Sequence, residues 1–211
     1  MNCKTDIYIP EKYVVFDLET TGLSPEYAEI IEIGAVRVEN GIIKERFQTY
    51  VNPRGRIPRQ ITELTGISSR QTDGAPRIED ATERFLKFIG DDILIAHNAP
   101  FDLRFMCTVC AILGYRFEND VMDSMKIAKR YIQSKSYKLE TLKNMLGIRL
   151  PSHSAIDDCV VTSRVVEYCR KKQKEGTDLL PPRIWKAVSI QNSPAPPLTM
   201  PVTLSQRQLV D

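Results

Sequence analysis

The chain has 211 residues, of which 42% are apolar, and this allows one well-packed domain with additional segments. Its formal net charge of +2 is nearly balanced, so any attraction to nucleic acid or anionic lipid has to be local. No apolar run approaches the ~20 residues that span a membrane, and the first residues lack the apolar core of a signal peptide. We therefore expect a cytoplasmic protein that does not enter a membrane.

Three strands are predicted in the first quarter of the chain, over residues 13–18, 29–39 and 42–51. Asn40-Gly41 is predicted to join the second and third strands in a tight turn. Both positions of such a turn need a positive φ, which asparagine and glycine adopt readily. A loop with three arginines then leads to a short helical stretch that ends near residues 64–67. Apolar residues at helical spacing, with Pro76 in the first turn, predict the next helix over residues 76–89.

The second half of the folded region alternates short strands with helices. We expect strands over residues 93–96 and 121–123, and helices over residues 100–113, 124–132, 138–146 and 155–172. Antiparallel strands followed by this alternation predict an α/β domain with a mixed sheet covered by helices. Beyond Lys174 the periodicity ends and proline becomes frequent. We predict a folded domain over residues 1–174 and a proline-rich tail, a possible flexible tether, over residues 175–211.

The five cysteines favour a reducing compartment over a disulfide framework, since their number is odd and an export signal is lacking. Cys107 and Cys110 form a CxxC pair, a spacing that could supply half of a zinc site. Cys159 and Cys169 are too far apart in the sequence to supply the other half. The favoured interpretation is that Cys107 and Cys110 are two small buried residues of a helix.

Asp17 and Glu19 stand at the end of the first predicted strand, where the preceding residues are entering a core. Residues i and i+2 of a strand share a face at roughly 6–7 Å, so these carboxylates would repel each other. A divalent cation between them removes the conflict, and hard oxygen ligands of this kind suit Mg²⁺ or Mn²⁺. Two solvated acids at an exposed strand edge are the alternative.

Asp102 falls in the first turn of the helix that follows "HNAP", where a carboxylate interacts favourably with the helix dipole. That interaction can also be its whole role. Its neighbours His97 and Phe101 are equally compatible with packing, and a histidine beside a strand is most often a hydrogen-bonded structural group.

The stretch "HSAIDD" brings His153 and Asp158 to the start of the last predicted helix. Ser154 with Asp157 resembles a capping box, which places the helix start at Ala155. A histidine near neutral pKa at this point could take a proton from a metal-bound water. A capped helix with an exposed histidine is the alternative.

Taken together, "FDLETTG", "HNAPFD" and "HSAIDD" resemble the three motifs of the DEDDh 3′–5′ exonucleases. The resemblance is strongest to the epsilon proofreading subunit of bacterial DNA polymerase III and to the exonuclease segment of its Gram-positive counterpart. It covers residues 11–172 and excludes the tail. It implies a ribonuclease H-like α/β fold, which has a mixed five-stranded sheet flanked by helices.

The resemblance also implies two-metal hydrolysis of phosphodiester bonds, with two Mg²⁺ or Mn²⁺ ions in each active site. Asp17, Glu19 and Asp158 would hold one metal, and Asp17 would bridge to the second. Asp102 would act mainly through metal-bound water, and His153 would deprotonate the attacking water. The expected substrate is a single-stranded or frayed DNA 3′ end, cut to nucleoside 5′-monophosphates in proofreading or repair. An exoribonuclease that trims RNA and a polymerase-docking module with little activity are the alternatives.

Further substrate contacts are implied by the same resemblance. Leu23 and Phe101 would pack against the terminal nucleotide, although their residue type alone favours core positions. Backbone groups around Thr20 and Thr21 would meet its 3′-hydroxyl. The tail is a natural tether to a DNA polymerase subunit, and its last residues, "QRQLVD", faintly suggest a sliding-clamp peptide.

Residues 124–150 carry an excess of basic side chains, with Glu140 as the one acid among them. The basic residues are Lys126, Lys129, Arg130, Lys135, Lys138, Lys143 and Arg149. This stretch could contact phosphates of a nucleic acid, or it could be a solvated helical surface. Tyr131 and Tyr137 could stack on bases or simply pack.

Overall fold

The computed structural model describes residues 8–150, 154–176 and 184–186. The strands within these residues are β1 (Lys12–Thr20), β2 (Ile30–Glu39), β3 (Ile42–Tyr50), β4 (Leu94–Ala96), β5 (Asp120–Asp123) and β6 (Ile184–Lys186). The helices are α1 (Arg59–Thr65), α2 (Ser69–Thr72), α3 (Ile78–Ile89), α4 (Pro100–Leu113), α5 (Ser124–Tyr131), α6 (Leu139–Met145) and α7 (Ala155–Lys174). Every predicted element is present with small shifts in its bounds, and α2 and β6 are additional.

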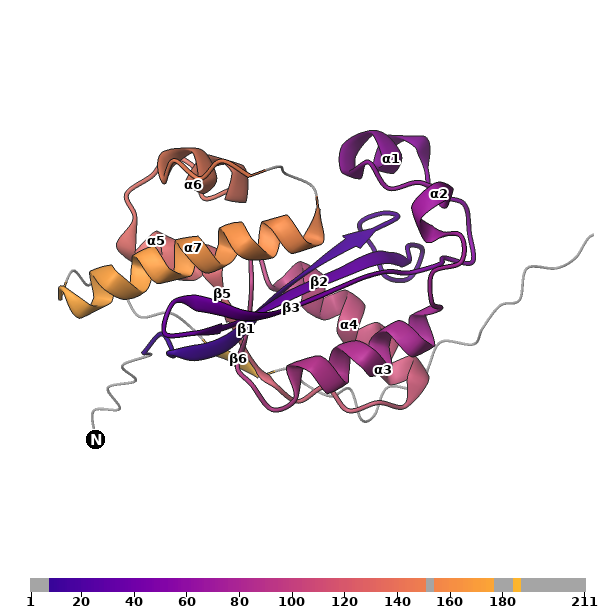
Figure 1. Ribbon diagram of the computed structural model, residues 1–211, viewed down its shortest axis with the longest axis horizontal. Coiled ribbons are helices and arrows are strands. Elements are labelled where there is room, and N and C mark those ends of the chain that lie inside the picture. The colour runs from indigo at the N-terminus through magenta and orange to yellow at the C-terminus, as the bar shows by residue number, and fades with distance from the viewer. Residues whose placement is uncertain (1–7, 151–153, 177–183, 187–211) are drawn as a thin grey trace, which may run out of the picture.

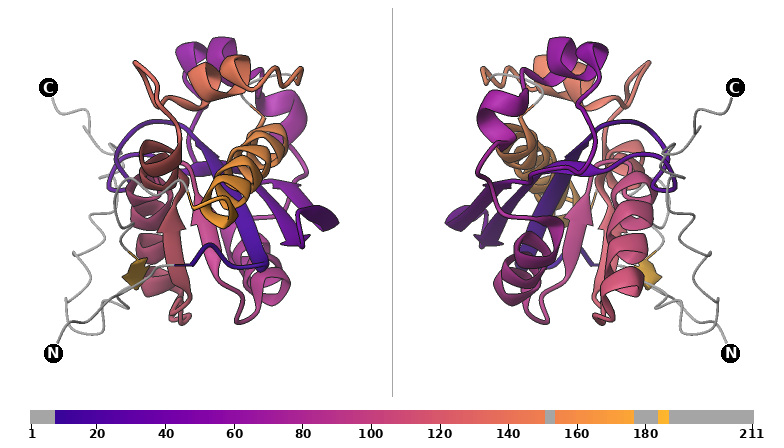
Figure 2. Two further views of the ribbon diagram at one scale, coloured as in Figure 1. Left: turned by 90° about the vertical axis from the view of Figure 1, so that its left-hand side faces the viewer. Right: turned by 90° about the vertical axis from the view of Figure 1, so that its right-hand side faces the viewer.

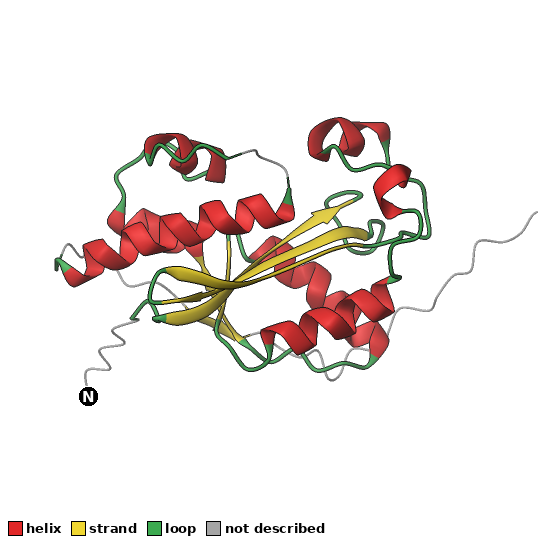
Figure 3. Ribbon diagram, viewed as in Figure 1, coloured by secondary structure: helices red, strands yellow, loops and turns green. Residues whose placement is uncertain are grey.

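The strands form one mixed sheet in the order β3-β2-β1-β4-β5-β6. The first three strands are antiparallel, and β4 and β5 run parallel to β1. The five strands expected from the sequence are therefore confirmed, with helices on both faces of the sheet (Figures 1 and 3). The added strand, β6, pairs antiparallel with β5. It comes from the segment predicted to be a tail, and the division at residue 174 stays a prediction.

The β2–β3 hairpin turns at Asn40-Gly41 as the sequence predicts. Asn40 has a φ of 53° and Gly41 a φ of 79°, so both turn positions lie in the left-handed region. Such a turn matches the natural twist of the two strands that it joins. It sets the register of β2 against β3 next to the turn.

Alternate residues of β1 pack into two separate cores. Val14, Phe16 and Leu18 lie in the core that the sheet forms with α3 and α4. Tyr13 and Val15 lie in the opposite core, which the sheet forms mainly with α5 and α7. Because strand side chains alternate, Asp17 and Glu19 belong to the α7 side of the sheet.

The helices are arranged accordingly. Figure 1 shows α7 along one face of the sheet and α3 and α4 along the other. The end-on views of Figure 2 show α1 and α6 on the α7 side as well. Among the described residues, no helix combines the length and the apolar character that a membrane span requires.

Candidate active site

Asp17 and Glu19 lie near the carboxyl end of β1 and share one face of the strand. Leu18 between them is 4% exposed and points into the core on the opposite side. Burial of this leucine therefore directs both acids toward α7, because neighbouring strand residues face opposite ways. Both carboxylates are half-buried, so the interpretation of two solvated acids at an exposed edge does not hold.

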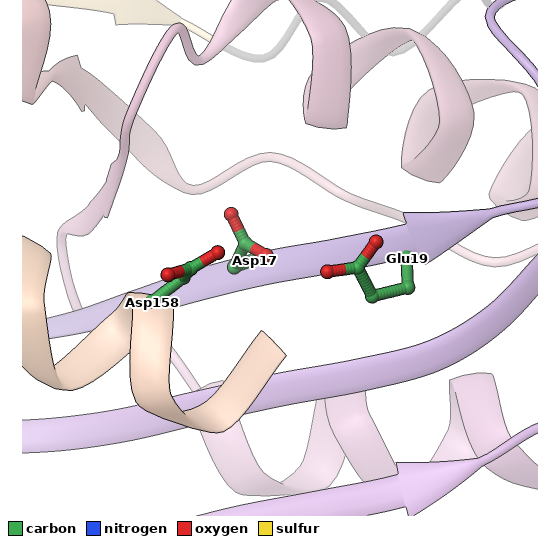
Figure 4. A group of neighbouring side chains, drawn as sticks. All are labelled: Asp17, Glu19 and Asp158. Atoms are coloured by element: carbon green, nitrogen blue, oxygen red, sulfur yellow. The ribbon is translucent and has the colours of Figure 1, made fainter. Parts of the chain in front are cut away.

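Asp158 joins these two acids from the first turn of α7. Carboxylate oxygens of Asp17, Glu19 and Asp158 lie within 4.8 Å of one another (Figure 4). Gly34 makes the approach possible, since it lies opposite Asp17 in the β1–β2 ladder. A Cβ atom at Gly34 would lie 2.5 Å from the carbonyl carbon of Ala155. Only glycine lets the backbone of α7 rest so closely on β2.

Asp102 reaches the same region from the first turn of α4. Its side chain is almost completely buried, with 2% of the residue exposed. Its Oδ1 accepts a hydrogen bond of 3.2 Å from the backbone N–H of Leu18. This bond holds Asp102 beside the strand position between the two acids of β1. The structure thus brings together the four acids that the motifs single out.

Burial and mutual repulsion raise the pKa values of this cluster. Burial is the largest cause for Asp17 and Asp102, and both pKa values lie well above the ordinary range of a carboxyl group. Burial, followed by the charges of Asp158 and Glu32, raises the pKa of Glu19 to about 8. The metal-free cluster therefore resists carrying all of its negative charges at neutral pH. A set of desolvated, converging carboxylates fits a hard divalent cation, which neutralises that charge.

A fifth acid, Glu32 on β2, lies opposite Glu19 in the β1–β2 ladder and was not predicted from the sequence. Its residue is 1% exposed, and burial raises its pKa. Oε1 accepts a hydrogen bond of 2.6 Å from Gln48 Nε2, and Oε2 accepts one of 3.1 Å from the backbone N–H of Ala155. The signal was available in "IIEIGAV", where one acid interrupts a run that is otherwise apolar.

The start of α7 is only partly as predicted. Ser154 occupies the N-cap and the helix begins at Ala155, which confirms the predicted start. The side chain of Ser154, however, makes no capping hydrogen bond, so the expected capping box is wrong. Glu32 satisfies the first backbone N–H of the helix instead. His153 lies outside the described residues, and its role stays a prediction.

The residues predicted to contact the substrate have varied surroundings, and their roles stay predictions. Leu23 is 82% exposed, so the core position that its residue type favours is wrong. Phe101 is half-buried and packs against Phe105, with 5.2 Å between the ring centroids. Thr20 Oγ1 donates a hydrogen bond of 2.6 Å to the carbonyl of Gly22. Thr21 Oγ1 accepts one of 2.9 Å from the N–H of Glu29, so both threonines shape the loop after β1.

His97 is hydrogen-bonded, and the two cysteines of the CxxC pair are packed, as structural residues are. Nδ1 of His97 lies 2.8 Å from Ser124 Oγ, and Nε2 lies 2.9 Å from the carbonyl oxygen of Tyr137. Burial lowers the pKa of this histidine, which favours the neutral imidazole. Cys107 and Cys110 on α4 belong to the core beneath the sheet, and burial raises the pKa of both thiols. These contacts are those of packing residues.

The basic stretch over residues 124–150 does not form one exposed face. Arg130 and Lys143 are each 7% exposed, so these two side chains are not available to a phosphate backbone. Tyr131 is 5% exposed and accepts a hydrogen bond from Gln173 Nε2. The alternative that this ring stacks on bases is therefore wrong. Tyr137 packs against the α7-side core and donates a hydrogen bond of 2.9 Å to the carbonyl of Ile132.

Comparison with known proteins places this site among nucleases. The RNase T exonuclease family matches residues 14–166, a range that contains all four acids. A PolC-type DNA polymerase III of Clostridium perfringens is 40% identical over 171 residues, which cover 80% of this chain and 12% of that protein. A DNA polymerase III subunit epsilon-like protein of Rhodobacter capsulatus is 40% identical over 158 residues, which cover 72% of this chain and 22% of that protein. The chain thus spans a small part of the length of these relatives.

A solved structure has the same fold. Exonuclease X, in complex with 5′-overhanging duplex DNA, superposes with a TM-score of 0.63 and 25% sequence identity. The superposition covers 75% of this chain and 92% of that chain. The predicted ribonuclease H-like fold is confirmed by this likeness together with the order of the strands.

Proposed function

The chain belongs to the RNase T exonuclease family, and from this premise we propose that it is a metal-dependent 3′–5′ exonuclease that acts on DNA ends. It hydrolyses the terminal phosphodiester bond and releases nucleoside 5′-monophosphates. Single-stranded or frayed 3′ ends are its substrates, as in proofreading or repair. The polymerase III relatives and the DNA in the Exonuclease X complex support DNA as the substrate class.

One observation carries this proposal, namely the convergence of Asp17, Glu19 and Asp158 within 4.8 Å on a strand and a helix. Three converging carboxylates repel a phosphate group unless cations are present. These residues would hold Mg²⁺ or Mn²⁺, and we propose two ions in each site. Such ions supply charge neutralisation at the scissile phosphate and lower the pKa of a bound water.

Each residue of the site has its own role in this proposal. Asp17, Glu19 and Asp158 would hold the cations, which would offset their negative charge. Asp102, held by the N–H of Leu18, completes the acidic surroundings from the α4 side. His153 accepts the proton of the attacking water. Exposed Leu23 and half-buried Phe101 contact the terminal nucleotide.

The test is release of nucleotides from a 3′-labelled DNA oligonucleotide with Mg²⁺ or Mn²⁺. Asp17→Asn and Asp158→Asn should each lower the rate more than about 100-fold, since even residues that only orient a ligand cost about 10- to 100-fold. Asp157→Asn is the matched control, because Asp157 is in the same helical turn and is not among the three converging acids. Undiminished activity of either site variant would remove the assignment.

The same assay distinguishes DNA from RNA. We expect faster digestion of a DNA oligonucleotide, and of a 3′-mismatched primer on its template, than of an RNA oligonucleotide of the same sequence. Faster digestion of the RNA would assign the protein to RNA trimming, because only contacts to the 2′-hydroxyl separate the two classes.

Two further proposals concern the surroundings of the enzyme. The tail over residues 175–211 tethers it to a DNA polymerase subunit or a sliding clamp, and the resemblance to polymerase III proteins supports this. We also propose a cytoplasmic location, which the same relatives support, since bacterial DNA is replicated there. Recovery of a clamp or polymerase subunit by the full chain, but not by a chain that ends at Lys174, is the expected outcome of a pull-down.

A further inference from the structure

We propose that Glu32 is a positioning residue that fastens the first turn of α7 to the sheet and so holds Asp158 beside Asp17 and Glu19. The proposal rests on the proposed function, because it assigns a task in the same site. Its basis is the pair of hydrogen bonds of the buried carboxylate, one to Gln48 on β3 and one to Ala155 on α7.

The start of α7 needs a partner from elsewhere in the chain. The first N–H groups of a helix have no acceptor within the helix, and a buried N–H without a partner is costly. Ala155 is completely buried, so water does not serve as its acceptor. The side chain of Ser154 makes no capping bond, and Glu32 Oε2 accepts a hydrogen bond of 3.1 Å from the Ala155 N–H. A negative group at this point also matches the positive end of the helix dipole.

Movement at Ala155 would be transmitted directly to Asp158. The backbone N–H of Asp158 donates a hydrogen bond of 2.9 Å to the carbonyl of Ser154, so the two ends of this first turn are linked. Two residues along β2, Gly34 makes the second contact, because its carbonyl accepts a hydrogen bond of 3.3 Å from Cys159 Sγ. Glu32 and Gly34 thus hold α7 against β2 on either side of the turn that carries Asp158.

Glu32 is distinct from the residues proposed to bind the cations. It is not among the three acids whose oxygens lie within 4.8 Å of one another. Both of its oxygens already accept hydrogen bonds within the protein. It therefore acts through α7, in the way that residues behind a metal ligand set the position of that ligand.

Four variants of the full chain separate this role from a general effect of burial or charge. Glu32→Gln keeps an oxygen for the Ala155 N–H, and the Gln48 amide can turn to offer its own oxygen to the new amide group. Glu32→Ala removes both bonds, and Glu32→Asp keeps the charge but shortens its reach. Thr49→Val is the control, because Thr49 is a buried polar residue of β3 whose hydroxyl donates only to the carbonyl of Tyr50.

The measurements are kcat and KM on a DNA oligonucleotide, and Mn²⁺ affinity by calorimetry without nucleic acid. Glu32→Ala and Glu32→Asp should lower kcat and Mn²⁺ affinity about 10- to 100-fold and leave KM for the oligonucleotide nearly unchanged. Glu32→Gln and Thr49→Val should have kcat values and Mn²⁺ affinities close to those of the wild type. If Glu32→Ala fails to fold, the comparison of Glu32→Asp with Glu32→Gln still shows whether the hydrogen bond to α7 is needed.

Two outcomes would overturn the proposal. Wild-type kcat and Mn²⁺ affinity in the Glu32→Asp variant would show that the hydrogen bond to α7 is not needed. Equal losses in Glu32→Gln and Glu32→Asp would assign the effect to something other than these hydrogen bonds. Failure of the proposed function is a separate result, because the wild type would then release no nucleotide. The Mn²⁺ affinities of the variants would still test the positioning role of Glu32.

Discussion

At the scale of single residues, Asp17, Glu19 and Asp102 have pKa values raised above those of exposed carboxylates. Glu19 has a pKa of about 8 against an ordinary value of 4.5, and Asp17 and Asp102 are shifted in the same direction. Burial is the first cause in each case, and repulsion by neighbouring acids adds to it. The metal-free site is therefore a source of instability that a bound cation relieves.

We expect this instability to depend on pH in a defined direction. Between pH 4.5 and about 8, folded Glu19 retains a proton that the unfolded chain releases, so a rise in pH favours unfolding. Urea unfolding in EDTA at a series of pH values measures the effect. The stability of Glu19→Gln should fall less steeply with pH than that of wild type, because residue 19 no longer titrates. Parallel pH profiles of the two proteins would contradict the prediction.

His153 gives a second prediction at this scale. If it accepts the proton of the attacking water, His153→Gln should lower kcat about 10²- to 10⁴-fold, which is the usual contribution of general base catalysis. Mn²⁺ affinity should be retained, because the histidine is not a proposed ligand. The rise of kcat with pH that reflects loss of its proton should disappear. A pH–rate profile identical to that of the wild type would exclude His153 as the base.

At the scale of elements, the contact between β2 and α7 decides whether the acids converge. The sheet supplies Asp17 and Glu19, and α7 supplies Asp158. The site therefore forms only while α7 stays packed against the sheet. Two glycines of this region face α7 in different ways. A Cβ at Gly34 would meet the backbone of Ala155, whereas one at Gly41 would meet the flexible end of Glu167, 2.7 Å from Oε2.

Gly34→Ala and Gly41→Ala should therefore separate activity from stability. The backbone of α7 cannot give way locally, so Gly34→Ala should displace the helix, lower the nuclease rate at least about 10-fold and destabilise the protein by about 1–3 kcal/mol. Gly41→Ala places a side chain at a φ of 79° and should cost about 1–2 kcal/mol with the rate unchanged. Urea unfolding and the nuclease assay measure both quantities. Equal rates in the two variants would show that close approach at Gly34 is not needed.

At the scale of the whole molecule, a bound cation would connect the first strand with the last long helix. A ligand that binds only the folded state stabilises it by about 2.7 kcal/mol when its concentration is 100 times its Kd. For a domain of this size we expect Mn²⁺ to raise the Tm by about 5–10 °C.

Calorimetric scans with Mn²⁺ and with EDTA measure this shift. Asp158→Asn should lose most of it, and Asp157→Asn should keep it, since only Asp158 belongs to the converging acids. A full shift in Asp158→Asn would place the cation elsewhere in the molecule.

Patterns that depend on neighbouring residues were readable from the sequence. Strand alternation places Asp17 and Glu19 on one face, and Asn40-Gly41 predicts the hairpin. The start of α7 at Ala155 was also predicted correctly, although the capping box on which that prediction rested is not formed. The motifs also identified the acids that converge, through their resemblance to a known family. These features are local or are carried by short motifs, so one sequence suffices to detect them.

Other features were decided by packing between distant segments. The cap of α7 comes from Glu32, 123 positions away along the chain, and not from the adjacent Ser154. Leu23 is exposed although its residue type favours a core position, and Tyr131 is buried although its residue type permits either position. The sequence by itself thus determined strands β1 to β5, the main helices and the four acids. Only the tertiary structure decided how α7 is held against β2, because burial and hydrogen-bond partners depend on which surfaces meet.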